Sequence, residues 1–154
     1  MTINKATFVG IDPAFRASGF AIAIEDGAGE LSFKIFKNGF EGFFFWLLND
    51  RPDNCFIGVE NSNLQNSTFI TTGTRAELAK RSRDVGKNQA VSQMVVDLCR
   101  TILGPERVAE FSPAQKGKKI TSLKLFEAIL REKRYKGIYN YKGNKNEQDK
   151  RDAF

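Results

Sequence analysis

Histidine is absent from the 154 residues of this chain, and cysteine and tryptophan are scarce, with two copies and one copy respectively. Without histidine the protein has no Ser-His-Asp triad, no histidine general base and none of the usual zinc sites that include histidine. Any metal ion must therefore be held by oxygen ligands, which are the ligands that Mg²⁺ prefers. Cys55 and Cys99 each lie in an apolar run, so we expect both to be reduced core residues of a cytoplasmic protein.

Long hydrophobic runs are also missing. No apolar stretch reaches the ~20 residues that a membrane-spanning helix needs. The short apolar run near the N-terminus ends in Asp12, unlike a signal peptide. The length is sufficient for one hydrophobic core without disulfides or a structural metal. We therefore expect residues 1–154 to form a single domain.

Charge is distributed unevenly along the chain, which has a formal net charge of +6. Residues 1–60 carry 5 basic and 8 acidic side chains, whereas residues 113–151 carry 12 basic and 4 acidic ones. Such asymmetry suggests a polyanion-binding face beside an acidic pocket, although a solvated basic surface would give the same composition. The positions of the acidic residues favour the first interpretation.

The first part of the chain predicts three hairpin-linked strands, a helix and a fourth strand. Turn-forming residues at 26–29 separate two strands, and the third strand alternates, with Leu31, Phe33 and Ile35 on one face. The helix is apolar on nearly every side, so it should be deeply buried or lie at an interface, and its aromatic run favours core packing over base stacking. The fourth strand is an unbroken apolar run, which favours burial on both faces. The predicted strands span 6–12, 19–25, 30–37 and 55–60, and the helix spans 43–48.

The second part of the chain predicts mainly helices, with one further strand. A polar loop precedes a helix that begins near Thr74 and is interrupted at Gly86. Apolar residues at three- and four-residue steps then indicate a clear helix, and a similar pattern returns after the last strand. The predicted elements are the loop 61–73, the helix 88–103 with Val91, Met94, Val95, Leu98, Cys99 and Ile102 on its apolar face, the strand 107–111, the helix 121–134 with Leu123, Phe126, Ile129 and Leu130 inward, a basic loop 133–145 and a final helix from about Asn146. The apolar face of 88–103 could pack on the sheet or contribute to dimerisation.

This order of elements predicts an α/β fold. Three antiparallel, hairpin-linked strands and two further strands form a mixed five-stranded sheet, which helices flank. Functional sites in such folds gather at the carboxyl ends of the strands. Asp12 and Glu60 stand at two of these ends.

Four carboxylates lie where predicted strands end or a predicted helix begins: Asp12, Glu60, Asp149 and Asp152. The last two are three residues apart, so they share a helix face. Carboxylates from neighbouring elements can converge on divalent ions, and two such ions stabilise both the attacking and the leaving oxygen of a phosphoryl transfer. Each residue alone also has an ordinary explanation, as a turn former, an emerging strand end or a partner of the helix dipole. Their joint placement predicts a Mg²⁺ site.

Five short motifs in this order resemble the RuvC-like Holliday junction resolvases of the ribonuclease H-like superfamily, and the resemblance covers essentially the whole chain. Each motif is weak to moderate alone, whereas five in the same order form a specific signal. The motifs are GIDP at 10–13 with SGFAI at 18–22, IGVEN at 57–61, GKNQA at 86–90, EFSPAQK at 110–116 and NEQDKRDA at 146–153.

The resemblance implies a ribonuclease H-like fold and a homodimer that cuts four-way DNA junctions by paired symmetric nicks, in DNA recombination and repair. It implies two Mg²⁺ ions per active site, which Mn²⁺ can replace, and 5′-phosphate and 3′-hydroxyl products. Asp12, Glu60, Asp149 and Asp152 match the family's catalytic and metal-binding positions, and Glu147 replaces Asp149 if the helix register differs. The basic residues expected to contact the DNA backbone in a salt-sensitive way are Lys80, Arg81, Arg83, Lys87, Lys116, Lys118 and Lys119.

The sequence departs from the family pattern in two places. Ala14 stands where the family often has glycine, and the final helix is expected to be truncated because the chain ends at Phe154. The loop residue Arg16 could approach the phosphate, although an exposed loop arginine explains it equally.

Two alternatives stay open. One is another structure-selective nuclease of the same superfamily, acting on flaps or RNA–DNA hybrids, since the metal chemistry is shared. The other is a non-catalytic junction-binding module, against which the four intact carboxylates argue. An actin-like kinase or ATPase would need a duplicated domain and a nucleotide pocket, and the chain is too short and has no Walker-type phosphate loop. The compact size is compatible with a phage member, which would act in the host cytoplasm.

Overall fold

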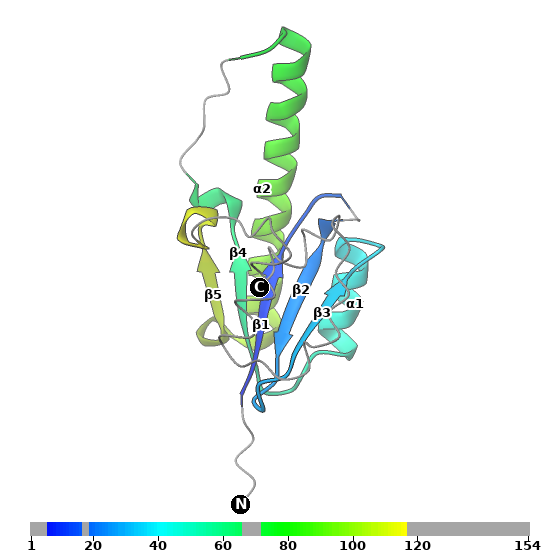
Figure 1. Ribbon diagram of the computed structural model, residues 1–154, viewed down its shortest axis with the longest axis vertical. Helices are drawn as coiled ribbons and strands as arrows, with labels where there is room; N and C mark the ends of the chain where they lie inside the picture. Colours follow the sequence, from blue (N-terminus) through cyan, green and yellow to red (C-terminus); the bar gives the residue numbers. More distant parts are fainter. Residues whose placement is uncertain (1–5, 17–18, 66–71, 117–154) are drawn as a thin grey trace, which may run out of the picture.

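The computed structural model describes residues 6–16, 19–65 and 72–116, and these contain a five-stranded sheet (Figure 1). The strand order is β3-β2-β1-β4-β5. Strands β1 to β3 are antiparallel neighbours, whereas β4 runs parallel to β1 and β5 runs parallel to β4. This topology confirms the predicted mixed α/β sheet and is consistent with a ribonuclease H-like fold. The strands are β1 (Thr7–Asp12), β2 (Ala21–Glu25), β3 (Leu31–Ile35), β4 (Cys55–Glu60) and β5 (Val108–Phe111).

Two helices, α1 (Phe40–Asn49) and α2 (Arg75–Leu103), pack on one face of the sheet (Figure 1). Successive residues of a strand point to opposite faces, so every second strand residue points toward these helices. The core on this face includes Val9, Ile11, Ile57 and Val59 of the sheet, Phe43 and Leu47 of α1, and Val95 and Cys99 of α2.

The opposite face of the sheet carries aromatic residues and glycines. Parallel pairing places Phe8 beside Phe56, and the two rings stack with centroids 5.9 Å apart. Phe56 is 38% exposed, so the prediction that β4 is buried on both faces is wrong, because α1 and α2 cover only the other face. Gly10 and Gly58 are the next partners along the same face. We call this surface, marked by Phe8, Phe56 and Phe111, the phenylalanine face.

The hairpin between β2 and β3 forms as the sequence predicts. The carboxylate of Asp26 accepts hydrogen bonds from the backbone N–H groups of Ala28 and Glu30, both 2.8 Å long. Gly29 adopts a φ of 84°, a left-handed conformation that glycine takes without steric cost. Strand β4 has the predicted bounds, and the other four strands begin one or two residues later than predicted.

Helix α1 is longer than predicted and only half-buried. Phe43, Trp46 and Leu47 point into the core, whereas Phe45 is 56% exposed and Leu48 45% exposed. Of the two predicted alternatives, deep burial is wrong, because one side of the helix is exposed, and a position at an interface stays a prediction. Core packing of Phe43 and Trp46 agrees with the expectation for the aromatic run.

Helix α2 is one continuous helix, and the predicted interruption at Gly86 does not occur. A glycine inside a helix costs about 1 kcal/mol relative to alanine, which the helix tolerates. The helix begins near Thr74, as predicted, and Thr74 is its N-cap and forms a capping box with Glu77. Met94, which the sequence pattern places on the apolar face of this helix, is 51% exposed, whereas Val96 is buried.

Three short 3₁₀ turns complete the described residues: η2 (Ser62–Leu64), η3 (Pro105–Arg107) and η4 (Pro113–Lys116). Turn η2 occupies part of the predicted loop 61–73. Among the described residues no helix is long and apolar enough to cross a membrane. The predicted helix 121–134, the basic loop 133–145 and the final helix lie outside the described residues.

Candidate functional site

Asp12 and Glu60 lie at the carboxyl ends of the neighbouring parallel strands β1 and β4, as predicted. Each directly follows a member of the register pair Ile11 and Val59, so the two carboxylates stand next to each other across the strands. Because side chains alternate along a strand, both point to the face that carries Gly10 and Gly58 rather than to the helices. Both residues are partly exposed. They lie at the carboxyl ends of these two inner strands, where a ligand has access.

Two adjacent carboxylates suit Mg²⁺, which binds through one or two carboxylates and keeps several waters. Within the described part of the chain, no group of three or more potential ligand residues comes together. The described residues therefore offer Mg²⁺ one pair of oxygen ligands. Asp149, Asp152 and the alternative ligand Glu147 lie outside the described residues.

The loop after Asp12 is attached to helix α2. The backbone N–H of Phe15 donates a hydrogen bond of 3.1 Å to the side-chain oxygen of Asn88. The ammonium group of Lys87 lies 4.5 Å from the centre of the Phe15 ring, in cation–π geometry. These contacts place Lys87 beside the loop that leaves the Asp12 strand end. Arg16, in the same loop, is exposed.

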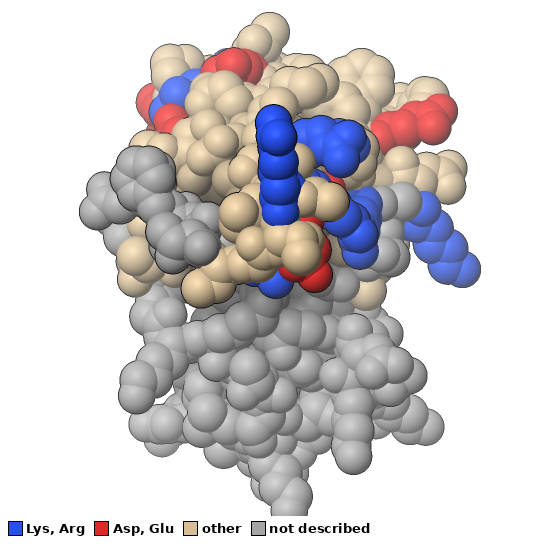
Figure 2. All heavy atoms as spheres, turned by 90° about the horizontal axis from the view of Figure 1, so that it is seen from above, with Lys and Arg blue, Asp and Glu red and all other residues tan. Residues whose placement is uncertain are grey.

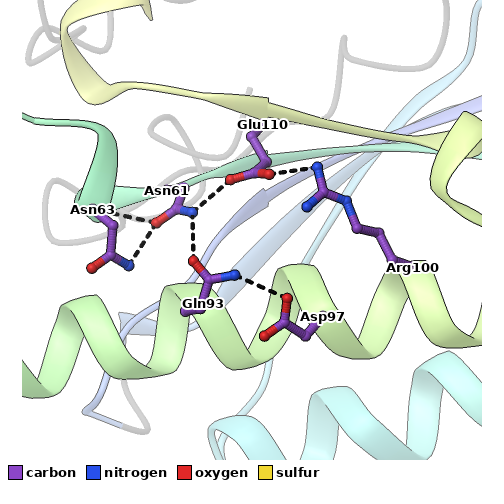
Figure 3. A network of polar contacts seen from close by, with 6 residues as sticks. All are labelled: Asn61, Asn63, Gln93, Asp97, Arg100 and Glu110. Carbon is purple, nitrogen blue, oxygen red and sulfur yellow. Dashed lines mark hydrogen bonds and ion pairs between the residues drawn. The ribbon is translucent and has the colours of Figure 1, made fainter.

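The turn after Glu60 is attached to the same helix through a buried amide (Figure 3). Asn61 is 1% exposed, and its NH₂ group donates to Glu110 at 2.7 Å and to Gln93 at 3.4 Å. Its side-chain oxygen accepts two hydrogen bonds of 2.9 Å from Asn63. All the hydrogen-bonding capacity of this amide is used, so the end of β4 is fixed in place.

Glu110 of β5 extends this network to the last turn of α2 (Figure 3). It forms an ion pair of 2.5 Å with Arg100, whose side chain is 39% exposed while that of Glu110 is 19% exposed. Gln93 in turn donates to Asp97 at 2.9 Å. The network therefore connects β4, β5 and α2 directly behind Glu60.

Further contacts join the turn after Glu60 to α2. The hydroxyl groups of Ser62 and Ser92 lie 3.1 Å apart, and the Asn63 amide donates to the backbone oxygen of Gln89 at 2.7 Å. Together with Lys87 and Asn88, these residues span only two turns of the helix. One short segment of α2, residues 87–93, thus holds both carboxylate-bearing strand ends.

The N-terminal half of α2 projects beyond the sheet at the end where β1 and β4 finish (Figure 1). It carries the predicted DNA-contact residues Lys80, Arg81, Arg83 and Lys87, all of which are exposed. Lys80, Arg83 and Lys87 are spaced i, i+3 and i+7, so they line one side of the helix, which we call the basic row. The row ends at Lys87, beside the loop that follows Asp12. Figure 2 looks onto this end and shows Lys and Arg side chains gathered there.

Lys116 is the last described residue, at the end of η4. Lys118 and Lys119 lie outside the described residues.

Sequence reasoning missed the polar network around Asn61. A signal was present, because Glu110 follows the buried Val108 by two residues and so points toward the helices, where a carboxylate needs a partner. The partner, Arg100, is ten residues earlier on α2, and only the packing of β5 on that helix brings the two together.

Comparison of the chain with protein-family models, with curated proteins and with solved structures finds no match. The function must therefore be argued from the site itself.

Proposed function

We propose that this chain is a Mg²⁺-dependent endonuclease that resolves four-way DNA junctions by paired symmetric nicks, acting as a homodimer. The observation that carries the proposal is the pairing of Asp12 and Glu60 at neighbouring parallel strand ends, held by one segment of a basic helix. A metal-dependent phosphodiesterase needs carboxylates that bind the metal ions and, beside them, basic side chains that bind the phosphate. The carboxylate pair and the basic row supply these two opposite charges.

The chain's own residues have separate roles in this proposal. Asp12 and Glu60 supply oxygen ligands, and Asp149 and Asp152 are the proposed further ligands from the C-terminal segment. Bound Mg²⁺ or Mn²⁺ would supply Lewis-acid activation of water and stabilisation of the departing oxygen. In the reaction, a water oxygen bonds to phosphorus and the bond from phosphorus to the 3′ oxygen breaks. The products are a 5′-phosphate and a 3′-hydroxyl.

The basic row positions the DNA. Lys80, Arg83 and Lys87 span eight residues of helix, a rise of about 10 Å, and lead toward Asp12. Contacts of this kind bind phosphates of any sequence, so they fix the path of a strand rather than a cleavage site. Arg81 lies about a quarter turn from Lys80 around the helix, and we propose that it contacts the DNA backbone from the side. Lys116, Lys118 and Lys119 are proposed to add contacts after β5. The protein would act in the cytoplasm, where recombination intermediates of a cell or of an infecting phage are found.

The proposal is tested with four labelled substrates of equal length: a four-way junction, a linear duplex, a 5′ flap and an RNA–DNA hybrid. Each is incubated with the protein in Mg²⁺, in Mn²⁺ and in EDTA, and the ends are mapped on sequencing gels. We expect symmetric nicks in opposite strands of the junction, with 5′-phosphate ends, in either metal and none in EDTA.

Other outcomes have defined meanings. Preferential cutting of the flap or the hybrid would keep the metal site and overturn the junction assignment. Tight junction binding without cutting in either metal would identify a binding module instead. Cutting that persists in EDTA would overturn the role of the carboxylates.

A further inference from the structure

Phe15 is an exposed aromatic residue in the loop that leaves the Asp12 strand end. It is 50% exposed, although the backbone around it is fixed, because Pro13 is buried and Asn88 accepts a hydrogen bond from the Phe15 backbone N–H. A phenyl ring held in water contributes little apolar burial, so core packing does not explain this side chain. Single exposed apolar residues are common, so exposure alone assigns no role.

The surroundings of Phe15 distinguish it from the other exposed phenylalanines that the structure describes. Those belong to the phenylalanine face or, in the case of Phe45, to helix α1. Phe15 instead stands three residues after Asp12, and the ammonium group of Lys87 lies over its ring, 4.5 Å from the centre. Lys87 is the last member of the basic row and occupies one face of the ring. Half of the residue surface stays exposed, so a flat partner can reach the other face.

A ring beside a cation matches the two parts of a nucleotide. An aromatic side chain stacks on the flat base, and a lysine binds the phosphate as a point charge. Stacking does not depend on base identity, because every base has a π-face, and one stacked base strengthens binding by about 5- to 150-fold. The cation–π contact orients the ring before DNA arrives, which reduces the entropy lost on binding. Phe15 and Lys87 together therefore have the chemistry of a nucleotide contact.

Stacking on a side chain requires a base that has left the stack of its own helix. Unstacking and unpairing are costly in a continuous duplex and least costly for a base that is already single-stranded. The position of the ring also limits which base can be reached. Three residues span at most about 10 Å, and a DNA strand rises about 3.4 Å per nucleotide. The base therefore belongs to a nucleotide close to the phosphate at the pair of Asp12 and Glu60.

We infer that Phe15 stacks on an unpaired base within about three nucleotides of the phosphate at the carboxylate pair, while Lys87 binds a phosphate of the same strand. The site then selects DNA with a locally unpaired strand over continuous duplex, by shape rather than by sequence. The inference rests on the proposed function only in that it needs DNA at this site, and it stands if the chain binds branched DNA without cutting it.

The test uses a four-way junction in which 5-iododeoxyuridine replaces one nucleotide, at each position within about three nucleotides of the branch point in turn. Near-ultraviolet light breaks the carbon–iodine bond, and the base radical then bonds to an aromatic ring stacked on it. The full chain is irradiated with this junction and with a linear duplex that carries the same substitution, in Ca²⁺ in place of Mg²⁺ to prevent cutting. Mass spectrometry of the crosslinked peptide identifies the attached residue.

We expect at least one position of the junction to crosslink to Phe15, at least about tenfold more efficiently than any position of the duplex. Phe15→Leu keeps the apolar character without the ring, so it should weaken junction binding by about fivefold or more and duplex binding by less than about twofold. Phe15→Trp should restore the affinity for the junction. Phe45→Leu, the matched change at an exposed phenylalanine outside the site, should leave both affinities unchanged.

The salt dependence of junction binding separates stacking from a structural effect. Phe15 carries no charge, so Phe15→Leu should leave the slope of log affinity against log salt unchanged. Lys87→Gln removes a phosphate contact and should reduce that slope by about 0.7 to 0.9. If Phe15 only shaped the loop, its loss would displace Lys87 as well, and Phe15→Leu would reduce the slope in the same way.

Four results would overturn the inference while the junction is still bound. They are crosslinks that map only to residues other than Phe15, equal crosslinking of junction and duplex, junction binding by Phe15→Leu as tight as that of the unmodified chain, and a reduced salt slope in Phe15→Leu. Symmetric cutting of the junction in Mg²⁺ would leave the proposed function intact in each case. An unmodified chain that binds no branched DNA would overturn both.

Discussion

The side chain of Asn61 donates a hydrogen bond of 2.7 Å to Glu110, which lies 49 residues further along the chain. Asn61 directly follows Glu60, so this contact fixes the strand end that presents a proposed metal ligand. The contact is part of the network that joins β4, β5 and α2, and it makes the geometry of the site sensitive to one amide.

Replacing Asn61 with alanine should therefore destabilise the protein. The change removes the hydrogen bonds that the buried Asn61 amide makes to Glu110, Gln93 and Asn63, and their loss should together cost about 1–3 kcal/mol. Asn49→Ala is a matched control, since the exposed Asn49 amide makes one bond to the backbone of Phe45 and should cost less than about 0.5 kcal/mol. Urea unfolding of both variants measures the difference, and equal free energies of unfolding would contradict the role assigned to Asn61.

Two glycine-to-alanine changes should have opposite signs. At Gly58 an added Cβ would meet the Phe111 ring at 2.7 Å, so Gly58→Ala should destabilise by about 1–3 kcal/mol. In a Phe111→Ala background the same change should be neutral or stabilising. At Gly86 nothing lies within 4 Å of the added Cβ, and Gly86→Ala should stabilise the protein by about 1 kcal/mol. Thermal unfolding of the four variants tests both signs, and destabilisation by Gly86→Ala would mean that α2 is distorted at that residue.

The basic row should set the salt dependence of DNA binding. Lys80→Gln with Arg83→Gln removes two exposed charges from the row, and Lys34→Gln with Lys37→Gln removes two exposed charges from the region of β3. Each lost phosphate contact should reduce the slope of log affinity against log salt by about 0.9. We expect a slope reduced by up to about 2 for the first pair, measured on a junction by fluorescence anisotropy. An equal effect of the second pair would show that only net charge matters.

The N-terminal cap of α2 should depend on pH. Hydrogen bonds from the backbone and side chain of Thr74 lower the pKa of Glu77 below its ordinary value of 4.5. A carboxylate with a lowered folded pKa contributes its stabilisation above the unfolded pKa and loses it as the pH falls through the folded pKa. The protection factors of the amides in the first turn of α2, taken relative to intrinsic exchange at each pH, should therefore fall below about pH 4.5. In Thr74→Ala the carboxyl titration followed by NMR should shift upward toward the ordinary value, and an unchanged midpoint would contradict the capping box.

Local sequence patterns were sufficient for much of this fold. The alternation of Leu31, Phe33 and Ile35, the turn at 26–29 and the helix start near Thr74 are local signals, and each led to the correct element. The carboxylates at the ends of β1 and β4 were also found in this way, because an acidic residue that ends an apolar strand is visible in the sequence.

Features that depend on which face is covered could not be read locally. The apolar run of β4 is the same whether Phe56 is covered by a helix or exposed, and only the position of α1 and α2 decides it. Glycine has a low helix propensity, so the sequence predicted an interruption at Gly86, whereas the cap at Thr74 and the packed C-terminal half hold α2 together. The partnership of Glu110 with Asn61 and Arg100 required the packing of β5 on α2.

The most direct test of the account compares Asp12→Asn and Glu60→Gln with Asp53→Asn, an exposed carboxylate outside the site. All three variants remove one negative charge, so they separate the site from net charge. We expect the first two to cut a four-way junction at least a hundredfold more slowly in Mg²⁺ while binding it as tightly as the unmodified chain. Asp53→Asn should cut at the unmodified rate. Full cutting activity in Asp12→Asn or Glu60→Gln would contradict the assignment of this carboxylate pair as the centre of the nuclease site.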